Sequence, residues 1–211
     1  MIMTDSFRPT SFRNKAWEAL RGKWGMAAVA CLIYMAISTV GAGISSIIPF
    51  AGPLAISLLV IYPVSMGFMF MLLDLSNGKE VDIKTMFEAF SDYGRYLLGG
   101  VLVYVYTILW SLLFLIPGII KGISYSQTFF LMRENPELSG EQAIQLSMKM
   151  MQGHKMEYFL LQLSFIGWIL LGCITLCIGL LWVQPYITTA NAEFYKELKK
   201  DYEVRQGLNA A

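Results

Sequence analysis

The stretch that decides the fold runs from Trp24 to Leu73: WGMAAVACLIYMAISTVGAGISSIIPFAGPLAISLLVIYPVSMGFMFMLL. Its 50 residues include no Asp, Glu, Lys or Arg. Because a membrane helix needs about 20 apolar residues, the stretch is long enough for two spans. It breaks near its middle at PFAGP, residues 49–53, where Pro and Gly favour a turn. We therefore expect a helical hairpin that crosses the membrane twice.

Two further stretches have the same character. Residues 96–132 contain one charge, Lys121, and residues 158–192 contain none. Each is too long for one span, since a helix of about 35 residues would extend about 53 Å. Pro117-Gly118 and the pair Gly172 and Gly179 mark central breaks. The sequence thus predicts an all-α, polytopic membrane helix bundle with six spans in three helical hairpins, at roughly 26–47, 54–74, 97–115, 118–133, 158–173 and 178–195.

A four-span alternative takes 96–120 and 159–183 as single helices and places 121–157 on the far side of the membrane. The distribution of charge favours six spans, because every charged residue except Lys121 then lies on one side. Basic residues near the membrane mark the cytoplasmic side. We therefore expect both termini in the cytoplasm.

Composition excludes several classes of protein. Of the 211 residues, 56% are hydrophobic and 15% are charged, whereas a soluble domain has about 25% charged residues. The net charge of +1 excludes a nucleic-acid binder that depends on bulk electrostatics. One His and three Cys provide little for a metal centre or a disulfide framework. We expect no metal and no cofactor.

Each predicted hairpin follows a segment with apolar residues at helical spacing. Asp82 is expected to cap the second segment, and Ser139 with Gln142 forms a capping-box pattern in the third. We expect cytoplasmic amphipathic connector helices, either lying in the headgroup region or packed on the bundle. The unit repeats over about 8–75, 82–135 and 139–202 within a single membrane domain, 1–211. Parallel repeats of this kind predict a pseudo-threefold arrangement about the membrane normal.

Three segments carry a family resemblance. They are RNKAWEALRGKWGMAA at 13–28, LIPGIIKGISYSQTFFLMRENPELSGEQAIQLSMKMMQGHKMEYFLLQLSFIGWILL at 115–171 and CIGLLWVQPYITTANAEFYKEL at 177–198. The chain resembles the bacterial integral-membrane family called domain of unknown function 975. More distantly it is similar to YciC-type proteins and to the membrane domains of some glycerophosphodiester phosphodiesterases. The resemblance implies a multi-pass protein of the bacterial cytoplasmic (inner) membrane, and it brings no established activity or functional residue.

Two polar stripes lie in predicted returning spans. The candidates for a polar lining or lipid contact are Lys121, Tyr125 and Thr128 in span four, and Gln184, Thr188 and Asn191 in span six. Both sets recur at i, i+4 and i+7, so each shares a helix face. The small residues Gly118, Gly122 and Ser126 lie beside the first set and suit close helix packing. The stripes predict either a cavity lining or hydrogen bonds within a packed bundle.

Lys121, the single His and two of the Cys residues are candidates for chemistry. Lys121 either snorkels to the interface or binds an anionic headgroup or substrate. The single His, His154, is expected to be solvated or bonded to headgroups. Cys173 and Cys177 either form a disulfide at the outer turn or fill small apolar spaces. We expect the Trp residues to lie in the interfacial belt or in packing contacts.

These features favour a non-enzymatic membrane protein that acts as a scaffold or accessory subunit. Its expected partners are the bilayer and other membrane proteins or further copies of itself, without nucleic acid. The alternative is a small-molecule or lipid-handling transporter that uses the polar faces of spans four and six, and a cavity between those spans would distinguish it. An enzyme is disfavoured because the spans contain no carboxylate, no His cluster and no nucleophile beside a base.

Overall fold

The computed structural model describes residues 7–45, 55–175 and 178–207, and its regular structure there is entirely helical. The predicted turn at 49–53 lies outside the described residues. The helices are α1 (Pro9–Leu20), α2 (Trp24–Ser45), the π-helix η2 (Ser57–Ile61), α4 (Tyr62–Ser76), the 3₁₀-helix η3 (Ile83–Phe90), α5 (Tyr93–Leu113), α6 (Leu115–Tyr125), α7 (Thr128–Glu134), α8 (Gly140–Met150), α9 (Lys155–Leu163), α10 (Ile166–Ile174) and α11 (Leu180–Arg205).

Four helical segments among the described residues are long and apolar enough to cross a membrane. They are Trp24–Ile44, Ser57–Ser76, Tyr93–Leu112 and the α9–α10 pair Lys155–Ile174. α6 has 11 residues, or about 17 Å of helix, against a hydrocarbon core of about 30 Å. α11 has 26 residues, but its second half is charged. The all-α prediction is confirmed, with four candidate spans.

The predicted fourth span, 118–133, is two short helices. α6 ends at Tyr125 and α7 begins at Thr128, so the regular helix is interrupted at Ser126 and Gln127. The turn before it also lies earlier than predicted, at Phe114, whose backbone is extended (φ −158°, ψ 143°). Pro117-Gly118 falls in the first turn of α6, where proline is tolerated because no N–H is needed there.

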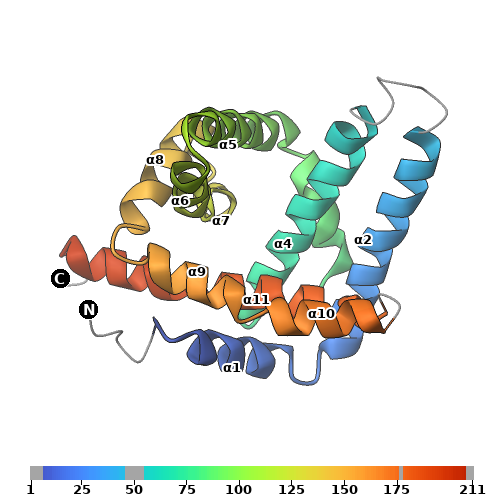
Figure 1. The fold of residues 1–211 in the computed structure, drawn as a ribbon. Coiled ribbons are helices and arrows are strands. Elements are labelled where there is room, and N and C mark those ends of the chain that lie inside the picture. The colour runs from blue at the N-terminus through green and yellow to red at the C-terminus, as the bar shows by residue number, and fades with distance from the viewer. Residues whose placement is uncertain (1–6, 46–54, 176–177, 208–211) are drawn as a thin grey trace.

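The three hairpins run in different directions (Figure 1). α2 and α4 form the first hairpin, α5 and α6 the second, and α9–α10 with α11 the third. Each connector helix packs against the returning helix of another hairpin, since η3 contacts α4, α8 contacts α7, and α1 contacts α11. The order of contacts therefore repeats from one hairpin to the next.

The connectors bury part of their apolar faces against protein, although Phe87 and Phe90 of η3 remain exposed. η3 buries Thr85, Met86 and Ala89, and a Cβ on Gly67 of α4 would lie 1.9 Å from the Met86 carbonyl oxygen, so the glycine permits this close approach. Asp82 caps η3 by accepting a hydrogen bond from the Lys84 N–H. The capping box of α8 is formed as predicted. These faces suit helices packed on the bundle.

Ion pairs join the charged segments to one another. Asp74 of α4 pairs with Arg133 of α7 at 3.4 Å. Glu134 of α7 accepts from Lys199 of α11 at 2.5 Å, and Lys15 of α1 pairs with Glu197 of α11 at 2.9 Å. All charged residues except Lys121 fall in four segments, 1–23, 74–95, 133–157 and 193–211. These ion pairs therefore bring the four segments together in one region of the molecule.

Candidate functional site

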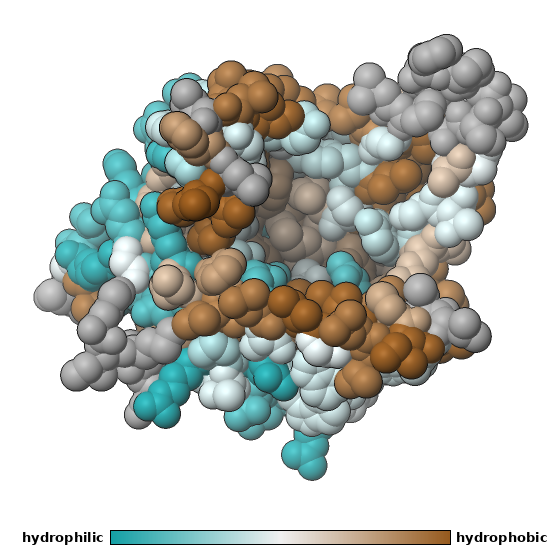
Figure 2. Space-filling view, viewed as in Figure 1, coloured by the Kyte–Doolittle hydropathy of each residue, from teal (hydrophilic) through white to brown (hydrophobic). Residues whose placement is uncertain are grey.

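A polar cavity lies where the three hairpins face one another. Its volume is about 220 Å³, and Figure 2 shows a hollow in the centre of this face, with apolar residues of the surrounding helices at its rim. The polar lining residues come from α2, α4, the α6–α7 junction, α9 and α11: Tyr34, Ser65, Ser126, Tyr158, Gln184, Thr188 and Asn191. Phe68, Met69 and Phe130 complete the wall. We call this space the central cavity.

The α11 face supplies the amides of the central cavity. The Asn191 Oδ1 accepts a hydrogen bond from Gln162 Nε2 of α9 at 2.7 Å, which leaves the Asn191 Nδ2 free to donate. The Thr188 hydroxyl donates to the Gln184 carbonyl of its own helix at 3.0 Å and keeps its acceptor positions. The Gln184 carboxamide forms no hydrogen bond with any described residue. Donors and acceptors are therefore both available to a ligand.

Among the described residues that line the central cavity there is no Asp, Glu, Lys, Arg or His. Unpaired charge on a ligand would therefore be costly here, because nothing in the wall offsets the loss of hydration. Hydroxyl and amide groups instead suit an uncharged ligand that both donates and accepts hydrogen bonds. The arrangement can bind and orient such a ligand.

The structure separates the two predicted stripes. Gln184, Thr188 and Asn191 line the central cavity, whereas Lys121 and Tyr125 line a different one. Thr128 lines neither cavity, being buried with its hydroxyl donating to the Tyr125 carbonyl oxygen at 2.7 Å. The break between α6 and α7 explains the difference, because it takes Thr128 off the helix that carries Lys121.

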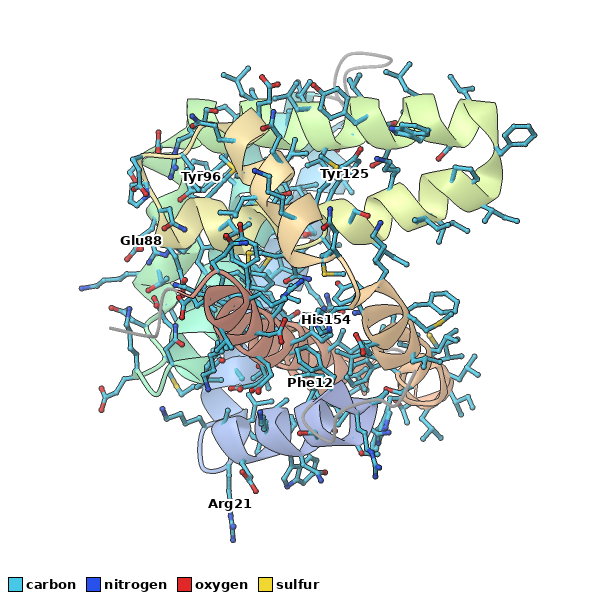
Figure 3. The ribbon with its side chains drawn as sticks, turned by 90° about the vertical axis from the view of Figure 1, so that its left-hand side faces the viewer. Phe12, Arg21, Glu88, Tyr96, Tyr125 and His154 are labelled. Carbon is cyan, nitrogen blue, oxygen red and sulfur yellow. The ribbon has the colours of Figure 1, made fainter. Side chains whose placement is uncertain are left out.

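Lys121 lies beside a connector helix. Its ammonium is 4.7 Å from the ring centre of Trp110 in α5 and 4.0 Å from the Met148 Sδ in α8. Figure 3 shows the neighbouring Tyr125 between the α5 and α6 ribbons. The small stripe beside Lys121 faces α5, since a Cβ on Gly118 would lie 2.1 Å from the Ser111 Oγ.

Sequence reasoning missed three polar residues of the central cavity. Tyr34 and Ser65 lie in the apolar runs of α2 and α4, and Tyr158 follows the charged start of α9. Each is the one polar residue that its helix contributes to the described lining, so no repeated spacing marked it.

His154 is not solvated as expected. Its side chain is 14% exposed, with Nδ1 2.7 Å from a Glu157 carboxylate oxygen and Nε2 3.1 Å from one of Asp201. Its ring also stacks on Phe7, with centroids 4.1 Å apart. Figure 3 places it beside α9 and α11. The cluster joins the chain before α1 to both helices, and it includes no nucleophile.

Four of the five Trp residues gather around one apolar cavity of about 400 Å³. Trp17 and Trp24 meet edge to face with centroids 5.0 Å apart, and Trp168 and Trp182 line the same space. Trp17 remains 53% exposed. This placement is compatible with packing and belt roles together.

The described residues contain no group of three or more His, Cys, Asp and Glu side chains placed to hold a metal ion. Cys173 is a free, exposed thiol, and its predicted partner Cys177 lies outside the described residues. Cys31 is free and buried.

Comparison with known proteins gives a match to a family model over part of the chain. No curated protein and no solved structure matches the chain. The similarity expected from the two longer quoted segments is confirmed, whereas the opening segment at 13–28 lies outside the match. From the end of α5 through most of α11, residues 112–202 match the family model described as "Protein of unknown function (DUF975)".

Proposed function

We propose that this protein is a non-enzymatic, multi-pass protein of a bacterial cytoplasmic membrane that binds a small, uncharged polar molecule in the central cavity and carries or presents it there. The observation that supports this function is the cavity itself. All three hairpins contribute to its wall, and the Gln184 carboxamide in that wall has no partner among the described residues. Gln184 is exposed, so its carboxamide is accessible to a ligand, to which it can both donate and accept hydrogen bonds.

The proposed topology has six membrane segments with both termini in the cytoplasm. The four candidate spans are four of these segments. The α6–α7 pair and the first half of α11 are the other two. Two observations support this arrangement: the connectors pack in the same cyclic order in each hairpin, and ion pairs such as Asp74–Arg133 join charged segments from different hairpins. A pseudo-threefold axis through the central cavity accounts for both.

The ligand class follows from size and chemistry. The central cavity of about 220 Å³ corresponds to roughly seven water volumes at about 30 Å³ each. Because the lining offers hydroxyls and amides without charge, a neutral polyol fits it best, either free or as the headgroup of a neutral lipid. The scaffold role remains the second candidate, favoured by the many exposed apolar side chains of α2, α5 and α10, which suit lipid or a neighbouring membrane protein.

The test is ligand binding by the purified protein in nanodiscs. Glycerol, inositol and short-chain diacylglycerol serve as neutral probes, and glycerol 3-phosphate serves as the charged comparison. A neutral probe should bind wild type, and Gln184→Leu and Asn191→Leu should weaken its binding at least tenfold. Thr39→Val is the matched control, because Thr39 is exposed and its hydroxyl donates to the Met35 carbonyl oxygen away from the central cavity. If all probes bind equally, or if no probe binds, the ligand-binding function is contradicted and the scaffold role is favoured.

A further inference from the structure

A second cavity, of about 250 Å³, lies between α5, α6 and α8 and shares no lining residue with the central cavity. It is lined by two groups of opposite charge on different helices, Lys121 of α6 and Glu141 of α8. The two charges face the same space, yet they do not form an ion pair with each other or with any other described residue. We call this space the charged cavity.

The Lys121 ammonium lacks an oxygen acceptor within the described residues. Its contacts are the Trp110 ring, 4.7 Å from the ring centre, and the Met148 thioether at 4.0 Å. An ammonium has three donors, whereas a thioether is a weak acceptor and a ring has no lone pair to offer. In an otherwise uncharged stretch of 37 residues, a partly buried ammonium left in this state favours an anionic ligand group.

Glu141 is equally free to accept. Its one described side-chain hydrogen bond is a long one, with Gln145 Nε2 donating to Oε1 at 3.4 Å. A carboxylate has about four acceptor positions, and Glu141 is exposed, so most of these positions are available to a ligand. Glu141 also lies in the first turn of α8, where the helix dipole stabilises a negative charge. This stabilisation does not occupy the hydrogen-bond acceptor positions of the carboxylate.

We propose that the charged cavity binds a zwitterion, whose oxyanion contacts Lys121 and whose ammonium contacts Glu141. An anion would be repelled by the Glu141 carboxylate, and a cation would be repelled by the Lys121 ammonium. A ligand that carries both charges can pair with both side chains. The ring of Tyr106, which also lines the charged cavity, offers a further contact for the ammonium end. A phosphoethanolamine group has this chemistry, whether free or as a lipid headgroup.

Calorimetric titration of the full chain tests the assignment. The probes are glycerophosphoethanolamine and dihexanoyl phosphatidylethanolamine. The comparisons carry charge of one sign, negative for glycerol 3-phosphate and positive for ethanolamine. Wild type should bind the zwitterions at least tenfold more tightly than either comparison. Lys121→Leu and Glu141→Gln should each remove that preference, and Lys121→Arg should keep most of it. Lys200→Leu and Glu137→Gln, exposed residues that do not line the charged cavity, are the matched controls.

Each outcome decides the proposal. Tighter binding of the lipid than of the soluble headgroup assigns the site to a lipid, and equal binding assigns it to a soluble zwitterion. Glycerol 3-phosphate that binds as tightly as the zwitterions, and more tightly still to Glu141→Gln, would overturn the zwitterion site in favour of an anion site. Unchanged zwitterion binding in Lys121→Leu, with an unchanged Tm, would also overturn it, because Lys121 would then only pack on Trp110.

Discussion

Arg133 of α7 pairs with Asp74 of α4, its Nη2 lying 3.4 Å from the Asp74 Oδ2, although 59 residues separate the two along the chain. Arg133 also pairs with Glu88 of η3 at 2.5 Å. The ends of two returning helices and a connector therefore meet on one side of the molecule. These contacts support the proposed six-segment topology, which places residues 74–95 and 133–157 on the same side of the membrane.

The first prediction concerns this topology. In a variant without native cysteines, Glu137→Cys and Lys200→Cys should both react with a membrane-impermeant thiol reagent only after the cytoplasmic side is opened. Both residues are exposed, so the reagent can reach them. Reaction of Glu137→Cys in intact cells would instead support the four-span alternative.

The second prediction concerns the approach of η3 to α4. Gly67→Ala should destabilise the protein by about 1–3 kcal/mol, because the new Cβ would lie 1.9 Å from the Met86 carbonyl oxygen, and backbone cannot move aside as a side chain does. Gly25→Ala, with nothing within 4 Å of its Cβ, is the matched control and should be neutral or slightly stabilising. Thermal unfolding in detergent measures both, and equal Tm values for the two variants would contradict the packing.

The third prediction concerns His154. His154→Gln should lower the free energy of unfolding by about 1–3 kcal/mol, since Glu157, only 6% exposed, loses its hydrogen-bond partner. The double variant with Glu157→Gln should lose less than the sum of the two single changes, because a carboxamide carries no charge to leave unpaired. Strict additivity in the double-mutant cycle would show that the two side chains do not interact.

The fourth prediction concerns the depth of Trp17. With the other four Trp residues replaced by Phe, Trp17 should be quenched by lipids brominated near the headgroup, because it is 53% exposed beside the basic residues of α1. Lipids brominated near the chain ends should quench it less. Absence of quenching by either lipid would place α1 away from the bilayer surface.

The sequence predicted what depends on composition and local chemistry. The uncharged run from Trp24 to Leu73 predicted a helical hairpin, and Ser139 with Gln142 predicted the capping box of α8. The break after Tyr125 was not predicted, because no Pro or Gly marks Ser126 and Gln127. Here tertiary contacts decide, since the buried Ser147 of α8 donates to the Ser124 carbonyl oxygen at 2.7 Å.

Only part of the candidate site could be predicted from the sequence, because the rest depends on tertiary contacts. The α11 stripe repeats along one helix, so its face was predicted from spacing. Tyr34 and Tyr158 reach the central cavity from separate helices, and only the packing of the three hairpins brings them together. The environment of His154 likewise depends on Asp201, which is 47 residues away.

The most direct test of the central claim is whether water and a polar ligand reach Thr188. In a cysteine-free background, Thr188→Cys should react with a small polar thiol reagent, and a neutral polyol that binds wild type should slow that reaction. Val40→Cys, exposed on α2 and lining an apolar space rather than the central cavity, should react far more slowly. Equal, slow reaction at both positions, unaffected by any polyol, would contradict a polar ligand cavity between the hairpins.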